Sequence, residues 1–296
     1  MNNQKVLMHV YAIVAIHLWA LGYVMTRVAV RHFTPEAISF LRYLVAALSL
    51  LSFAIVKKLR LPKPRDIPLL FLGGAIGFAV YVYMINLGSQ TLEASNVSFI
   101  ISTGPIITAL LAKILLHESM GFIGWLSVLC AFTGVGIITL FDGGFAFNSG
   151  AIWICFAAIL VSFYNIYQRK MLRRYSPLEI TTYCVIAGAL ILSVFAPQSF
   201  PQLLNAEPIG IVVIIILGMF SAGIAYLCWA SALSIAEKTS DVTSYMFVTP
   251  IITTILGLIL IGETPGISVF IGGFLVLVGV VLISQQPTTL KGRGLQ

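Results

Sequence analysis

"PIITALLAKILLHE" (residues 105–118) returns as "PIITTILGLILIGE" (residues 250–263), 145 positions further along a chain of 296 residues. Extended without a gap to residues 138 and 283, the two copies share 12 identities in 34 positions. Shared leucines and isoleucines are common in any apolar chain, so other residue types carry the comparison. The informative pairs are Pro105/Pro250, Thr108/Thr253, Glu118/Glu263, Gly121/Gly266 and Gly134/Gly279. The chain therefore contains an internal repeat of about half its length.

The composition is that of a membrane protein. Apolar residues make up 59% of the chain, charged residues make up only 9%, and the mean hydropathy is +1.02. So few charges cannot cover a water-exposed surface, which makes lipid the solvent. A backbone in lipid must satisfy its hydrogen bonds internally, and apolar runs of roughly 20 residues fit helices better than barrel strands. The predicted fold class is an all-α polytopic membrane protein.

Ten transmembrane helices are predicted, five in each half. They cover residues 8–30, 36–56, 67–88, 94–116, 121–140, 150–168, 178–196, 209–234, 240–262 and 266–285. Five is an odd number, so the second copy enters the membrane from the opposite side. This predicts two inverted five-helix repeats, residues 1–141 and 142–296, with substrate held between them near the midplane. The alternative is chance similarity, or a duplication that serves only the stability of the bundle.

Basic residues orient the predicted spans. With the N-terminus in the cytoplasm, 14 of the 17 lysines and arginines fall at cytoplasmic ends. Only Arg27 and Arg31 fall outside, and Arg42 lies within the second span. The positive-inside rule then places both termini in the cytoplasm. The net charge of +7 thus reflects membrane orientation and does not indicate a nucleic-acid partner.

The chain lacks the residue patterns of membrane enzymes and ATP-driven pumps. It has no HExxH, GxSxG or Walker sequence and no paired aspartates within a span. Its cysteines lie singly in apolar runs and are read as packing residues, without a disulfide or metal role. They are Cys130, Cys155, Cys184 and Cys228. No catalytic residue, metal or cofactor is therefore expected.

Candidate substrate-binding residues lie in the middle of several predicted spans. Pro105 and Pro250 should kink their helices, because proline cannot donate to the carbonyl four residues earlier. Ordinary packing is the alternative for each candidate, and for Arg42 snorkelling or pairing with a carbonyl is favoured over binding a substrate carboxylate. The candidates are His17, Phe78, Tyr81, Phe99, Thr103, Tyr164, Tyr226, Trp229 and Ser244. Together they would offer ring faces and hydroxyls without a fixed charge.

Further segments resemble a known family. "LWALGYVMTR" (18–27), "TPEAISFLRYLVAAL" (34–48) and the two repeated blocks resemble the EamA family of the drug/metabolite transporter superfamily. The resemblance implies ten helices and export of metabolites, commonly amino acids, from the bacterial cytoplasm. Aromatic amino-acid exporters are the most similar members in overall impression. Trp19, Arg42 and Glu118 match recurrent family positions, whereas Val161 and Cys184 depart from the tryptophan and arginine expected in the second copy.

The expected function is a secondary transporter of the bacterial inner membrane that exports small organic metabolites by alternating access. Aromatic or hydrophobic amino acids are the preferred substrates. The alternatives are a broader metabolite or drug exporter and a membrane-embedded enzyme or sensor. Since no acidic residue lies deep in a span, a gradient-driven carrier is expected, with proton coupling through His17 as the alternative. The partners are the substrate and the bilayer, and the protein is expected as a monomer.

Overall fold

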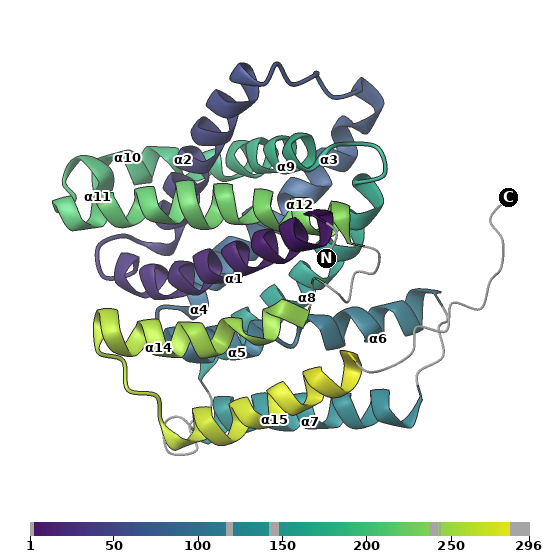
Figure 1. Ribbon diagram of the computed structural model, residues 1–296. Helices are drawn as coiled ribbons and strands as arrows, with labels where there is room; N and C mark the ends of the chain where they lie inside the picture. The colour runs from purple at the N-terminus through teal and green to yellow at the C-terminus, as the bar shows by residue number, and fades with distance from the viewer. Residues whose placement is uncertain (1–2, 117–120, 142–147, 237–241, 243, 285–296) are drawn as a thin grey trace, which may run out of the picture.

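The computed structural model describes residues 3–116, 121–141, 148–236, 242 and 244–284, and the regular elements of this part are helical (Figure 1). The long elements are α1 (Asn3–Ala29), α2 (Pro35–Val56), α7 (Phe122–Phe141), α8 (Ser149–Met171), α9 (Pro177–Leu192) and α15 (Ile267–Ser284). The shorter ones are α3 (Ile67–Gly74), α4 (Val80–Gly88), α5 (Ala94–Ile101), α6 (Gly104–Leu116), α10 (Ala196–Leu204), α11 (Pro208–Ile215), α12 (Ala225–Ile235) and α14 (Thr249–Ile261). Brief 3₁₀ or π segments join several of them.

The structure confirms the prediction of an all-helical polytopic membrane protein. Among the residues that the structure describes, six helical runs are long and apolar enough to cross a bilayer, and three more are apolar but shorter. The six are Gln4–Ala29, Pro35–Val56, Pro64–Gly88, Ser149–Met171, Pro177–Leu204 and Pro208–Ile235. Large apolar side chains such as Ile55, Phe122 and Phe274 are exposed at 67–81% of their surface. Exposed apolar surface of this extent is typical of contact with lipid. Ten spans with inverted topology stay a prediction.

Two helices begin with the same capping device at matching positions of the repeat. Thr34 accepts a hydrogen bond from the backbone of Ala37 at the start of α2, and a proline follows it at the first helical position. At the start of α9, Ser176 Oγ accepts a hydrogen bond from the backbone N–H of Glu179, and the Glu179 carboxylate accepts one from the backbone N–H of Ser176. A hydroxyl cap followed by proline fixes a helix start. The similar stretches "FTPEAI" (33–38) and "YSPLEI" (175–180) therefore each start a helix in the same way.

The predicted kinks at the two prolines are complete breaks. Pro105 lies at the start of α6, after a turn that separates it from α5, and Pro250 lies at the start of α14. A 3₁₀ segment, η5 (Ser244–Phe247), precedes α14. Proline lacks an N–H but is tolerated in the first turn of a helix, so the chain restarts a helix there. The expectation of a continuous kinked helix is wrong for both.

Two further helical runs widen into π segments. η2 (Ala75–Ala79) joins α3 to α4, and η4 (Ile216–Ile224) joins α11 to α12. These segments occupy corresponding positions of the two halves. A Cβ placed on Gly77 in η2 would lie 2.2 Å from the Tyr164 ring, so the local widening accommodates a ring packed directly on the backbone. π segments are rare and occur frequently at functional sites.

Close helix contacts occur in corresponding pairs. A Cβ on Gly134 of α7 would lie 2.4 Å from the carbonyl oxygen of Gly272 in α15, and one on Gly279 would lie 2.6 Å from that of Ser127. Both pairs follow the 145-residue offset, so each contact is the counterpart of the other. Glycine permits such backbone approach between membrane helices. In Figure 1, α7 and α15 lie side by side at one edge of the bundle.

Candidate functional site

A small cavity lies in the interior of the bundle among helices of both halves. Its volume is about 20 Å³, which is room for about one water molecule. The lining residues are Trp19, Gly22 and Tyr23 of α1, Arg42 of α2, Tyr81, Val82 and Ile85 of α4, Ser221 of η4 and Tyr226 of α12. An organic solute therefore requires these helices to separate before it can enter.

Arg42 supplies a positive charge to this cavity. Its side chain is only 7% exposed, and Nη2 donates a hydrogen bond to Ser221 Oγ at 2.9 Å. Within the described residues, Nε has no partner and no carboxylate forms an ion pair with this arginine. Guanidinium stays charged in proteins, and this charge is buried without a carboxylate partner, 6.0 Å from the centroid of the Tyr43 ring. The expectation of snorkelling is wrong, because the side chain turns inward to a residue of the other half.

Aromatic rings continue from the cavity wall as one cluster. Ring centroids of Trp19 and Tyr226 are 5.2 Å apart and those of Trp19 and Trp229 are 4.9 Å apart. Phe78 extends the cluster to Tyr226 at 4.8 Å and to Tyr164 at 5.1 Å. Tilted and edge-on pairs at these separations are favourable. The cluster thus brings together four predicted residues, Phe78, Tyr164, Tyr226 and Trp229, while the fifth, Tyr81, lines the cavity itself.

The other predicted site residues lie elsewhere. His17 is on an exposed face of α1, where Nδ1 is 2.8 Å from the carbonyl oxygen of Ile13, so its predicted interior position is wrong. Phe99 packs against Gly273 on the α15 side of the bundle. The Thr103 hydroxyl donates to the Ile100 carbonyl oxygen in the α5–α6 turn and does not line the cavity.

Two more predicted elements lie at the helix breaks. Ser244 begins η5, and its side chain is outside the part that the structure describes. Pro105 and Pro250 begin α6 and α14, neither of which lines the cavity. The breaks and the cavity are therefore separate features, and the expectation that substrate lies directly beside the prolines is not supported by the lining of this cavity.

Sequence reasoning missed the polar half of the cavity. Arg42 and Ser221 come from helices 179 residues apart, and their hydrogen bond links the first half to the second. A charged residue deep in a span was the signal for Arg42, since such residues usually face the protein interior. Trp19 and Tyr23 lie four positions apart on the helical face that faces the cavity. Nothing in the sequence distinguished Ser221 from other serines.

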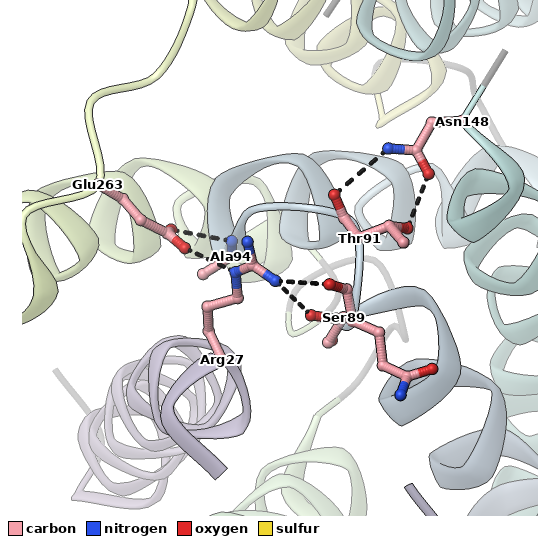
Figure 2. A network of polar contacts seen from close by, with 7 residues as sticks. Arg27, Ser89, Thr91, Ala94, Asn148 and Glu263 are labelled. Atoms are coloured by element: carbon pink, nitrogen blue, oxygen red, sulfur yellow. Dashed lines mark hydrogen bonds and ion pairs between the residues drawn. The ribbon is translucent and has the colours of Figure 1, made fainter. Parts of the chain in front are cut away.

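A polar network closes one end of the molecule beside α1 (Figure 2). Arg27 Nε is 3.1 Å from Glu263 Oε1, and Arg27 Nη1 donates to the carbonyl oxygens of Ser89 and Gln90 at 2.8 and 3.0 Å. The other oxygen of Glu263 accepts from the backbone N–H of Ala94 at 3.0 Å. Glu263 therefore caps α5, a helix of the other half. The network joins three connecting segments.

A second set of contacts holds the opposite end. His9 Nδ1 of α1 is 2.7 Å from the Tyr245 hydroxyl of η5. Asp66 accepts from the Tyr175 hydroxyl at 2.8 Å and from Arg174 at 3.4 Å. Burial and the hydrogen bond to Asp66 raise the pKa of Tyr175, so the phenol stays protonated and donates at neutral pH. Helix α1 is thus tied at both ends to the η5–α14 region.

These features define a class of protein: a polytopic helical membrane protein whose two parts enclose a small, aromatic, cationic site. The family model described as "EamA-like transporter family" matches residues 6–140 and again residues 148–285. The chain therefore belongs to the EamA-like transporter family.

Relatives in other organisms extend the comparison. An uncharacterized transporter of Bacillus subtilis, YdfC, is 32% identical over 266 residues, which cover 90% of this chain and 87% of that protein. A probable terminal-alkyne amino-acid exporter of Streptantibioticus cattleyicolor is 26% identical over 271 residues, or 90% of each chain. A solved structure titled "Crystal structure of protein" has a TM-score of 0.63 at 15% identity, covering 93% of this chain and 98% of the other. The last similarity concerns the fold alone.

Proposed function

We propose that the protein is a secondary transporter that exports amino acids with aromatic or other apolar side chains across the bacterial inner membrane. The observation that carries the substrate class is the buried charge of Arg42, which has no carboxylate partner among the described residues and lies beside the aromatic wall of the cavity. A substrate carboxylate would compensate that charge with a two-pronged ion pair, for which guanidinium is well suited. The naming of one relative as a probable amino-acid exporter supports the same class.

The substrate side chain would contact the rings beside Arg42. Tyr81, Tyr226 and Trp19 border the cavity, and a ring or unsaturated group between them would add about 0.5–1.5 kcal/mol per contact beyond its buried area. Buried polar atoms without a partner among the described residues, Trp19 Nε1 and Tyr43 Oη, lie in the same cluster. Either atom would hydrogen-bond the substrate carboxylate, or a water molecule that is bound to the substrate amino group. The site therefore suits a zwitterion with an apolar side chain.

Transport would proceed by alternating access between two inverted repeats, residues 1–141 and 142–296. Close contacts that cross between the halves in both directions support this arrangement: a Cβ on Gly74 would lie 2.8 Å from the Cys184 carbonyl oxygen, and one on Gly218 would lie 2.6 Å from that of Arg42. The first contact joins α3 to α9, and the second joins η4 to α2, so each links one half to the other. Rocking the halves against each other exchanges which end is open. In the present conformation the ends are held by the Arg27–Glu263 and His9–Tyr245 contacts.

The substrate test uses proteoliposomes that contain the full-length protein. Wild type should transport phenylalanine but not phenethylamine, which lacks the carboxylate. Arg42→Gln should raise the KM for phenylalanine roughly 30-fold or more, because losing one partner of a buried ion pair removes about 2–5 kcal/mol. Arg42→Lys should recover part of this loss, and His17→Ala, on the exposed face of α1, should behave as wild type. Equal transport of the acid and the amine by wild type would refute the carboxylate site.

The topology is tested separately with single cysteines in a protein whose four native cysteines have been replaced. Arg65→Cys and Glu207→Cys place thiols at side chains that are 80% and 75% exposed. The charge asymmetry predicts that a membrane-impermeant reagent labels position 207 in intact cells and position 65 only after permeabilisation. Labelling of both positions from the same side would contradict the inverted arrangement.

A further inference from the structure

An apolar groove opens beside the basic loop that joins α2 to the third helical run. Its volume is about 430 Å³, within the range of about 300–1,000 Å³ that is usual for ligand pockets and far larger than the central cavity. Its walls come from three helices, and the residues that carry the argument are Leu51 and Ile55 of α2, Ile67 and Phe71 of α3, and Ile186 and Leu190 of α9. Most of these side chains are exposed, so the groove opens toward the lipid-facing surface.

Two cations border the apolar walls. Lys58 and Arg60 line the groove, and no ion pair involves either of them within the described residues. The nearby carboxylate, Asp66, is already engaged by Arg174 and Tyr175. The Arg60 carbonyl oxygen accepts a hydrogen bond from Tyr183, which holds the loop over the groove. The groove is therefore apolar in depth and positively charged at its mouth.

The backbone at Lys58 adds an independent observation. Lys58 has φ = 51° and is the only non-glycine residue of the described chain with positive φ. It follows the C-cap of α2, and Leu59 N–H closes the terminal turn on the Ala54 carbonyl oxygen at 3.0 Å. Glycine or asparagine is favoured at such a position, and a Cβ is disfavoured there. A lysine at this position therefore contributes its charge at the expense of backbone preference.

We infer that this groove binds an anionic phospholipid of the cytoplasmic leaflet, with an acyl chain along the apolar walls and the headgroup phosphate at Lys58 and Arg60. The chemistry agrees with the known attraction of basic juxtamembrane segments to anionic lipids. The protein's own C-terminal residues 285–296 are a poorer occupant, because that segment carries Lys291 and Arg293 and no acidic residue. The inference rests on the membrane location and, for the leaflet, on the predicted orientation, and it is independent of the transported substrate.

The experiment measures lipid contact in nanodiscs with a tryptophan reporter, Phe71→Trp, in the groove. Brominated phosphatidylglycerol should quench this reporter at a roughly 25-fold lower mole fraction than brominated phosphatidylcholine does, at about fivefold per basic residue. Lys58→Asn with Arg60→Gln should abolish that preference, a loss of roughly 25-fold at about fivefold per basic residue. Asparagine suits positive φ, so the Lys58→Asn variant keeps the end of α2 folded.

The matched control is Lys63→Gln. It removes one positive charge from the same loop, at a residue that does not line the groove. It should leave the preference for phosphatidylglycerol intact, and inorganic phosphate should not compete with the lipid. Equal quenching by the two lipids in the reporter protein would overturn the inference. So would a loss of preference in Lys63→Gln as large as that in the double variant, because binding would then reflect the loop's charge alone.

Discussion

Replacing Glu263 with glutamine should loosen the end of the protein that the charge asymmetry assigns to the outside. The carboxylate now pairs with Arg27 at 3.1 Å and caps α5 through Ala94 at 3.0 Å (Figure 2). Glutamine has a similar shape and can still accept from Ala94, so the substitution removes mainly the charge. Arg27 keeps its bonds to the carbonyl oxygens of Ser89 and Gln90. The variant therefore isolates the ion pair.

The magnitude follows from the exposure of the pair. Side-chain exposures are 24% for Arg27 and 10% for Glu263, so the pair lies between a solvated surface and an interior environment. Exposed pairs contribute about 0–1 kcal/mol, and hydrogen bonds to charged groups contribute about 1.5–3 kcal/mol. An intermediate value of about 1–2 kcal/mol corresponds to a shift of roughly 5- to 30-fold between closed and open outer ends. A shift of this size is measurable in a two-state equilibrium.

Spin labels on Arg31→Cys and Thr264→Cys report the separation of the segments that the network joins. Both positions are exposed and lie on opposite sides of it. Glu263→Gln should enlarge the long-distance population in pulsed dipolar spectra of the reconstituted protein. Glu207→Gln removes a carboxylate near the same end, 75% exposed and 3.8 Å from His32, and should change nothing. An unchanged distance distribution in Glu263→Gln would refute a gating role for the pair.

Two glycine substitutions test the close packing. Gly134→Ala should lower the thermal unfolding temperature in detergent by an amount equivalent to about 1–3 kcal/mol, because its Cβ would lie 2.4 Å from the Gly272 carbonyl oxygen. The control is Gly136→Ala, whose Cβ meets nothing within 4 Å, and it should leave the unfolding temperature unchanged. Gly22→Ala would place a Cβ 2.2 Å from Ser221 Oγ in the cavity, so it should weaken substrate affinity roughly tenfold while the protein still inserts, again with Gly136→Ala as the unaffected control.

Most of the fold could be predicted because its signals are local. Apolar runs of membrane length follow from composition, and helix starts at Thr34 and Ser176 follow from a cap and a proline in adjacent positions. The π segments could not be predicted in this way. In η2 the accompanying contact is tertiary: Gly77 leaves room for the Tyr164 ring, which comes from α8. No short window of sequence contains both partners of that contact.

The candidate site likewise has members that local sequence signals predict and members that depend on tertiary contacts. The aromatic members were predicted from spacing along a helix and from the repeat, because Tyr81 and Tyr226 are 145 residues apart. The role of Arg42 was not, because an arginine in a span can snorkel outward or turn inward according to what lies beside it. Ser221, in the other half, decides the direction through a hydrogen bond of 2.9 Å. The misplacement of His17 has the same origin, since depth in a span says nothing about which face of the helix is buried.

Only one of the two repeated halves supplies a charge to the cavity. Arg42 corresponds to Cys184, which is buried in the second half with its sulfur 3.8 Å from the Tyr167 hydroxyl. The carbonyl oxygen of each residue lies against a glycine of the other half, Gly218 for Arg42 and Gly74 for Cys184, so the close backbone packing is similar in the two halves. Only the first half adds a cation to it. In the proposed mechanism the two similar halves rock between similar states, and the single guanidinium would give the substrate one place for its carboxylate in both states. On this view Cys184→Arg would create a second cationic position that competes for the carboxylate, and transport should slow even though the first site is intact.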